Sequence, residues 1–109
     1  MSELSLTSNI KIKDLPVNER PREKLLQRGP EILSDAELLA ILIGKGIKDK
    51  SAIDLAYEVI KKYESFKGLA GRTIEELKEI KGLGEAKILN IAAAFEIARR
   101  IVEEVQKYG

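Results

Sequence analysis

The segment Lys81-Gly82-Leu83-Gly84 is the part of the sequence best suited to binding a ligand. A short turn between two packed helices needs positive backbone dihedral angles, which glycine adopts without the steric cost of a Cβ. Such a turn leaves backbone N–H groups open at the start of the following helix, where partial positive charge collects. Because these donors reach phosphate oxygens and not base edges, the segment predicts sequence-independent contact with a nucleic-acid backbone.

The side chains around this glycine pair refine the prediction. We expect Leu83 to hold the turn against its own helices, and Lys81 and Lys87 to add positive charge at its rim. Glu85 opposes phosphate binding, because a carboxylate in the first helical turn interacts with the positive end of the helix and repels an anion. The alternative reading is that the glycines only end one helix and begin the next, as glycines commonly do.

Gly44 and Gly46 form another glycine pair, which opens a lysine-rich loop at 44–50. Lys45 stands where the pair at 82 and 84 encloses the apolar Leu83, and we expect Ile47 to take over that packing role. Three lysines within six residues could contact a second phosphate, although a lysine-rich loop is also typical of a solvated surface. The candidate phosphate-binding residues of this loop are Gly44, Lys45, Gly46, Lys48 and Lys50.

The remaining basic groups are expected to form ion pairs within their own helices. The basic residues between 20 and 28 alternate with glutamates, and Arg99 and Arg100 precede Glu103 and Glu104. Side chains three or four residues apart are neighbours on a helix surface. These groups are therefore weaker candidates for binding an anion than the two glycine loops.

Composition argues against an enzyme. The 109 residues include no Cys and no His, which excludes disulfides, thiolate chemistry and imidazole metal ligands, and no acid, base and nucleophile occur in a recognisable arrangement. We therefore predict no catalytic residue, no metal site and no cofactor. The 19 basic and 18 acidic residues nearly cancel to a net charge of +1, so attraction to a nucleic acid must come from local clusters of lysine. No secretory signal or membrane-spanning segment is recognisable, which favours the cytoplasm.

Capping signals and apolar periodicity predict an all-α domain with a single core, which this chain length can support. Ser34 with Glu37, Ser51 with Asp54 and Thr73 with Glu76 have the spacing of helix-capping boxes. The predicted helices cover about residues 20–28, 34–43, 51–63, 73–80 and 85–106, with one further helical turn possible at 66–69. Apolar residues at three-and-four spacing continue to the end of the last helix, so we expect Ile97, Ile101, Val102 and Val105 to widen its buried face.

An internal repeat relates the two glycine loops. The residues Glu37, Leu38, Ile41, Gly44 and Gly46 correspond to Glu76, Leu77, Ile80, Gly82 and Gly84. Two units of cap, short helix, glycine turn and longer helix can cover each other's apolar faces. The predicted fold is a compact bundle of about five helices that contains two helix-hairpin-helix units, with hairpins near 44–50 and 81–84. This tandem domain is expected to cover residues 14–109, preceded by a flexible arm at 1–13.

Several segments resemble a known family. The strings DLP at 14–16, ERPREKLL at 19–26, LSDAELLAIL at 33–42 and ELKEIKGLGEAK at 76–87 are similar to the N-terminal region of the bacterial RadC-like (UPF0758) proteins. The resemblance implies a helix-hairpin-helix domain from a family that carries a DNA-repair label. It also implies that longer relatives continue into a JAMM/MPN-type metalloprotease-like domain with a zinc site of His and Asp. A chain without His cannot hold that zinc site, and we expect it to be one domain of a longer protein.

Two functional hypotheses follow. The first is a non-catalytic, sequence-independent module, related to DNA repair, that binds the backbone of double-stranded or branched DNA through the two glycine loops. The alternative is a protein-interaction or scaffold domain that positions the C-terminal metalloprotease-like domain, in which case the glycine turns are purely structural. A salt-dependent DNA titration distinguishes the two, because only the first hypothesis predicts binding that weakens as salt rises.

Overall fold

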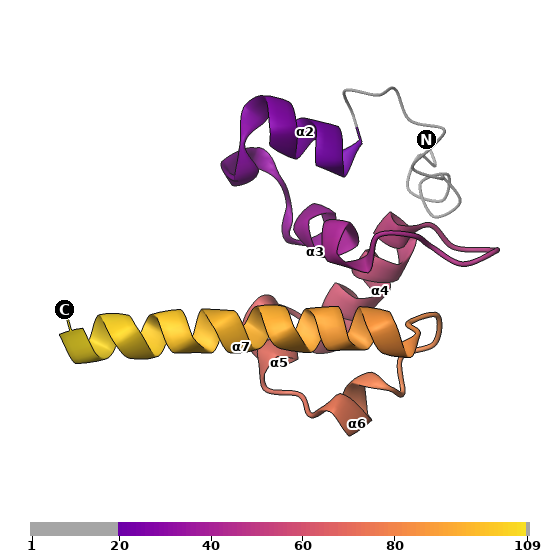
Figure 1. Ribbon diagram of the computed structural model, residues 1–109. Helices are drawn as coiled ribbons and strands as arrows, with labels where there is room; N and C mark the ends of the chain where they lie inside the picture. Colours follow the sequence, from indigo (N-terminus) through magenta and orange to yellow (C-terminus); the bar gives the residue numbers. More distant parts are fainter. Residues whose placement is uncertain (1–19, 109) are drawn as a thin grey trace.

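The computed structural model describes residues 20–108, and these residues form helices joined by short loops (Figure 1). No strand occurs among them, and one isolated bridge joins Ile47 to Lys50. The all-α fold class is therefore confirmed. The helices are α2 (Pro21–Arg28), the 3-10 turn η3 (Pro30–Ile32), α3 (Asp35–Ile43), α4 (Ala52–Tyr63), α5 (Phe66–Ala70), α6 (Ile74–Leu77) and α7 (Glu85–Tyr108). The predicted arm at 1–13 and the DLP segment lie outside the described residues.

The three predicted capping boxes are all formed. At the start of α3, the Ser34 hydroxyl accepts from the Glu37 N–H at 3.1 Å, and the Glu37 carboxylate accepts from the Ser34 N–H at 2.9 Å. The same reciprocal pair begins α4 with Ser51 and Asp54, and α6 with Thr73 and Glu76. Each pair satisfies two donors that the helix itself cannot bond, so these helices begin where the sequence predicts.

The cap of α4 is buried, and its loss should therefore cost more than the loss of an exposed cap. We expect Ser51→Ala to lower the free energy of unfolding by about 1–2 kcal/mol, because the Asp54 N–H would lose its acceptor away from water. Ser65→Ala is the matched control, since the Ser65 hydroxyl accepts from the Gly68 N–H at an exposed site. Urea denaturation followed by circular dichroism measures both variants. Equal losses would show that burial adds nothing to this cap.

Helix ends differ from the prediction in two places. The segment 66–70 forms the complete short helix α5, because the Ser65 hydroxyl caps it, and this brings the α-helices of the described chain to six. Helix α6 ends at Leu77 and not near Ile80. The N–H groups of Glu79 and Ile80 bond to carbonyls three residues earlier, at 3.1 Å each, which tightens the chain into the following turn.

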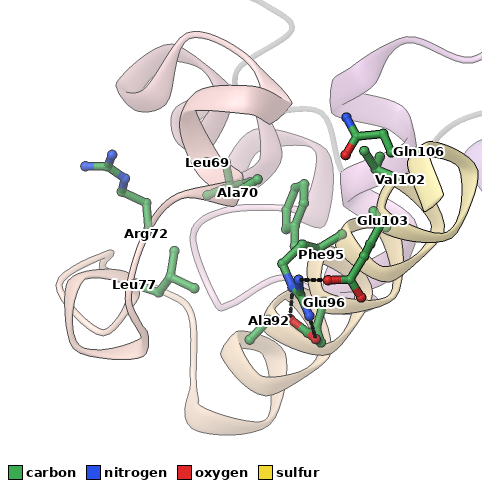
Figure 2. A pocket seen from close by; sticks show the side chains of 12 residues that line it. Leu69, Ala70, Arg72, Leu77, Ala92, Phe95, Glu96, Val102, Glu103 and Gln106 are labelled. Carbon is green, nitrogen blue, oxygen red and sulfur yellow. Dashed lines mark hydrogen bonds and ion pairs between the residues drawn. The ribbon is translucent and has the colours of Figure 1, made fainter.

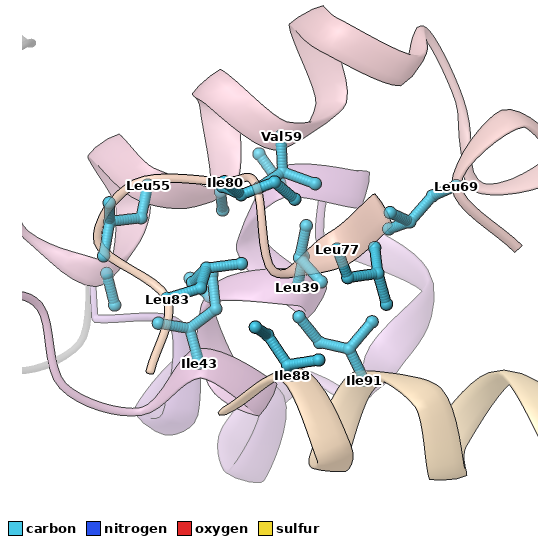
Figure 3. Close-up of a cluster of buried hydrophobic side chains, with 14 residues drawn as sticks. Leu39, Ile43, Leu55, Val59, Leu69, Leu77, Ile80, Leu83, Ile88 and Ile91 are labelled. Carbon is cyan, nitrogen blue, oxygen red and sulfur yellow. The ribbon is translucent and has the colours of Figure 1, made fainter. Parts of the chain in front are cut away.

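The core combines side chains from both sequence repeats (Figure 3). Leu39 and Ile43 come from α3, while Ile88 and Ile91 come from the first half of α7, which crosses α3. Helices α3 and α4 form the most extensive pair in the described chain. The two repeats therefore cover each other's apolar faces, as the sequence predicts. The largest side chains that are fully buried are Leu39, Leu55, Val59, Leu69, Ile88 and Ile91.

Helix α2 lies on the outside of this core and contacts α3. Pro21 is its one buried residue. The Lys24 ammonium lies 2.5 Å from the Glu37 carboxylate of α3. The expectation that this lysine pairs within its own helix is therefore wrong. The reason is that Glu37 is already held in place by its capping box and faces α2.

Candidate nucleic-acid interface

The two glycine loops lie side by side at one end of the molecule (Figure 1). The Lys87 ammonium donates to the carbonyl oxygen of Lys45 in the other loop. A Cβ added to Gly82 would lie 3.3 Å from Cδ1 of Ile47, so the loops also touch through apolar atoms. Segments 44–50 and 81–87 therefore form one continuous surface, which we call the hairpin surface.

The loop at 44–50, the first of the two glycine loops along the chain, is a closed turn. Helix α3 ends at Gly44, whose φ of 78° is in the region that favours glycine, and its N–H donates to the carbonyl of Ala40 at 2.9 Å. Ile47 and Lys50 exchange backbone hydrogen bonds of 2.8 and 3.2 Å, which places Lys48 at the tip of the turn. Gly46 packs against the Lys50 carbonyl so closely that a side chain would collide with it. The loop is thus held by its own backbone and presents its lysines outward.

The loop at 81–84, the second glycine loop along the chain, is held by the core beneath it. Gly82 has a φ of 91°, and a Cβ there would lie 2.6 Å from Cδ2 of Leu55. Leu83 is 7% exposed and belongs to the core, in the role that we expected for it. The prediction of a positive φ at both Gly82 and Gly84 is wrong for Gly84. The reason is that Gly84 already leads into α7. Gly44 and Gly82, the first members of the two pairs, both have positive φ, so the repeat extends to the backbone.

Helix α7 begins without a side-chain cap of the kind that starts α3, α4, α5 and α6. Gly84 stands before the first helical residue and its carbonyl accepts from Ile88 at 3.1 Å, but it has no side chain with which to cap the first turn. The N–H groups of Gly84, Glu85 and Ala86 donate to no other residue within 20–108. All three residues are exposed, and the space around Gly84 is open. These amides are therefore available to an external acceptor such as a phosphate oxygen.

The charges around these amides are mixed, with an excess of lysine. Lys45, Lys48 and Lys81 are exposed and form no ion pair with the rest of the described chain. Lys50 is less available, because its ammonium lies 2.7 Å from the Glu58 carboxylate. The opposing carboxylates of the surface are those of Asp49 and Glu85, both exposed.

The arginines of α7 lie away from the hairpin surface and are paired, as we expected. Arg99 contacts the carboxylates of Glu96 and Glu103, and Arg100 contacts Glu96. Hydrogen bonds from Arg99 and then Arg100 hold the pKa of Glu96 at about 2. Glu104 takes no part in these pairs, contrary to the expectation from its spacing.

A groove of about 590 Å³ separates α7 from the segment that runs through α5 and α6 (Figure 2). Its apolar lining includes Leu69, Leu77, Phe95 and Val102, and none of the predicted phosphate-binding residues lines it. The sequence does not predict this groove, because the apolar periodicity of the last helix assigns its whole apolar stripe to the core. The signal that could have located it is the length of α7, which exceeds that of every helix it could pack against.

Two further features concern the chemistry of residues 20–108. Within this range, no group of three or more carboxylates is placed to hold a metal ion. None of the helices in this range combines the length and the apolarity that crossing a membrane requires.

Comparison with known proteins places the chain in a family. The family model described as UPF0758 N-terminal matches residues 12–89. A UPF0758 protein from Caldanaerobacter subterraneus subsp. tengcongensis is 45% identical over 98 residues, which are 90% of this chain and 42% of the relative. A UPF0758 protein from Alkaliphilus metalliredigens is 54% identical over 91 residues, which are 83% of this chain and 39% of the relative.

A third relative, a UPF0758 protein from Nitrosococcus oceani, is 47% identical over 98 residues, covering 90% of this chain and 44% of the relative. No solved structure matches the chain. The chain thus spans less than half of the length of these curated relatives, and the family model that it matches is an N-terminal one. On this evidence the chain belongs to the UPF0758 family.

Proposed function

We propose that this chain is a non-catalytic module that binds the backbone of double-stranded or branched DNA without sequence preference. In this proposal α3 with α4, and α6 with α7, act as two helix-hairpin-helix units that meet at the hairpin surface. The observation that carries the proposal is the uncapped start of α7, where the open N–H groups of Gly84, Glu85 and Ala86 adjoin a lysine-rich loop.

The binding step follows from the positions of these groups. A phosphate oxygen accepts hydrogen bonds from the open N–H groups, and the partial positive charge at the start of a 24-residue helix attracts it. Lys81 adds charge beside this site, and Lys45 and Lys48 are available to a neighbouring phosphate from the first loop. Glu85 lowers the attraction, so the module alone should bind weakly, with a Kd on the order of 10⁻⁴ to 10⁻⁶ M.

Fluorescence anisotropy titrations of labelled duplex and branched DNA test the proposal. We expect binding at about 50 mM salt that weakens strongly at about 200 mM salt, because each phosphate contact releases counterions. Lys48→Glu/Lys81→Glu should weaken binding at least tenfold and reduce the dependence on salt, since both side chains are exposed and neither forms an ion pair within the described residues.

Lys61→Glu/Lys62→Glu on α4 is the matched control for these titrations, because it changes the net charge equally but lies towards the other end of α4. This control should retain nearly all of the affinity. No binding of the unchanged chain at low salt, or equal losses in the two double variants, would contradict the proposal.

The alternative function, a protein-interaction or scaffold module, is favoured by a different observation. The second half of α7 exposes apolar side chains, including Ile97 and Ile101, that nothing in the described chain covers. Gly84→Glu separates the two functions, because the open space at Gly84 allows the folded structure to persist. The variant should lose DNA binding but should keep any contact with a protein partner.

The biological setting is an extension of the same proposal. The resemblance to RadC-like proteins links DNA-backbone binding to DNA repair, and the relatives that we compared come from bacteria. A module that acts on chromosomal DNA would work in the bacterial cytoplasm. Survival of a deletion strain after DNA damage, with and without the Lys48→Glu/Lys81→Glu variant, tests this link.

A further inference from the structure

The second half of α7 is amphipathic but lacks an apolar partner in the described chain. The C-terminal part of this helix runs past the rest of the molecule (Figure 1). Its large apolar side chains there are between 54% and 77% exposed. We call this set the α7 stripe, and it consists of Ile97, Ile101, Val102, Val105 and Tyr108. The periodicity of the sequence predicts that four of these residues are buried, and that prediction is wrong for the described chain.

On another side of the same helix segment, charged side chains already have ion-pair partners. Glu96, Arg99, Arg100 and Glu103 pair with one another along it. Residues 97, 101, 105 and 108 follow the three-and-four spacing that brings side chains to one face of a helix. The segment therefore has a polar side whose charges are paired and partly line the groove, and an apolar side suited to packing against another body.

The groove lies on a different side of α7 from most of the stripe, and Val102 is the one stripe residue that lines it. The α7 wall of the groove also carries the paired side chains of Glu96, Arg99 and Glu103. The facing wall is formed by Leu69 and Leu77 from the α5 and α6 segment, with Phe95 at the base (Figure 2). The α7 stripe itself is therefore the apolar surface that another body would cover.

The lengths of the relatives indicate what this body is. The family model is described as N-terminal and ends at residue 89, and the matched regions amount to 39–44% of the relatives. More than half of each relative therefore lies outside the region shared with this chain. An attached segment is present at high effective concentration, so a modest apolar surface is enough to hold it.

A second copy of this chain fits the surface less well. The exposed segment 97–108 is about 18 Å long, at 1.5 Å per residue, and a helix is about 10 Å wide. A single helix face of this length offers less than the roughly 800 Å² of accessible surface per partner that a stable interface between separate molecules buries. The size of the surface favours a covalently attached partner over a dimer.

We infer that, in the longer UPF0758 proteins, the polypeptide that follows this helix packs against the α7 stripe. Helix α7 is then shared by the two parts, with its first half in the core of one and its second half under the other. The inference names the surface and the partner for the interaction-module alternative. It does not depend on DNA binding, because the hairpin surface lies at the other end of α7.

Amide hydrogen exchange tests this inference. Residues 97–108 of the 109-residue chain are compared with the aligned helix of the full-length relative from Caldanaerobacter subterraneus. In the short chain this segment should exchange rapidly, because a helix of that length is marginal without tertiary packing. In the full-length relative it should exchange at least tenfold more slowly, whereas the helix aligned with α4 should change much less.

Two substitutions in the full-length relative make the test specific. Glutamate at the residue aligned with Ile101 should abolish the protection, while glutamate at the residue aligned with Arg100, on the polar side, should leave it intact. Equal exchange in the two proteins would overturn the inference. Protection that accompanies a dimeric mass in either protein would overturn it in favour of a second copy. No DNA is present, so this experiment cannot be confused with a failure of the proposed function.

Discussion

Leu55→Ala is expected to lower the free energy of unfolding by about 2–5 kcal/mol, the usual cost of emptying a leucine site in a packed core. Leu55 is 0% exposed and belongs to the core that both repeats build. Its side chain also lies directly beneath Gly82, so the cavity would remove the support of the second glycine loop. Urea denaturation monitored by circular dichroism at 222 nm gives the free energy.

Leu26→Ala is the control for Leu55→Ala, because it makes the same chemical change on α2, where the side chain is 83% exposed. The cost there should stay within about 0.5 kcal/mol. A similar loss in the two variants would mean that Leu55 does not belong to a tightly packed core, and the account of how the two repeats support the hairpin surface would then be wrong.

Gly82→Ala should cost about 2–4 kcal/mol, which combines an unfavourable positive φ with a steric conflict. The φ of 91° is one that alanine rarely adopts, and the new Cβ would lie 2.6 Å from Cδ2 of Leu55. Gly84→Ala is the matched control in the same loop, since the space around Gly84 is open and its φ is not in the positive set. Its cost should not exceed about 1 kcal/mol.

Thermal unfolding of the two glycine variants measures this difference directly. For a domain of this size, a difference of 1 kcal/mol shifts Tm by roughly 4–8 °C. A Tm of Gly82→Ala equal to that of Gly84→Ala would contradict the geometry described for the second loop. It would also remove the physical basis of the repeat, because Gly44 and Gly82 would no longer share a required backbone conformation.

The helices could be predicted because their signals are local. A capping box such as Ser34 with Glu37 depends on residues three positions apart, so its structure follows from the sequence alone. Helix α5 was harder to predict, since five residues are too few to show a periodicity. The end of α6 at Leu77 depends on how the chain must turn to place Gly82 over Leu55, which is a tertiary requirement.

The candidate site was predictable in its residues but not in its assembly. The sequence singles out both glycine loops, and Gly84 before a helix without a capping side chain predicts open amides. The contact of Lys87 with the Lys45 carbonyl joins residues 42 positions apart, and no local pattern reports it. Ile97 and Ile101 show a different limit of sequence-based prediction. An apolar periodicity predicts that a helix face will be covered, but it does not identify the part of the protein that covers it.

Two-dimensional ¹H–¹⁵N NMR of the chain during titration with a short DNA duplex tests the proposed function most directly. We predict that the amide signals of Gly84, Glu85 and Ala86 shift most, together with those of Lys45 and Lys48, and that the shifts disappear as salt is raised. Signals of α4 near Lys61 should stay in place. Shifts centred on the second half of α7, or no shift at low salt, would contradict the claim that the hairpin surface binds the phosphate backbone.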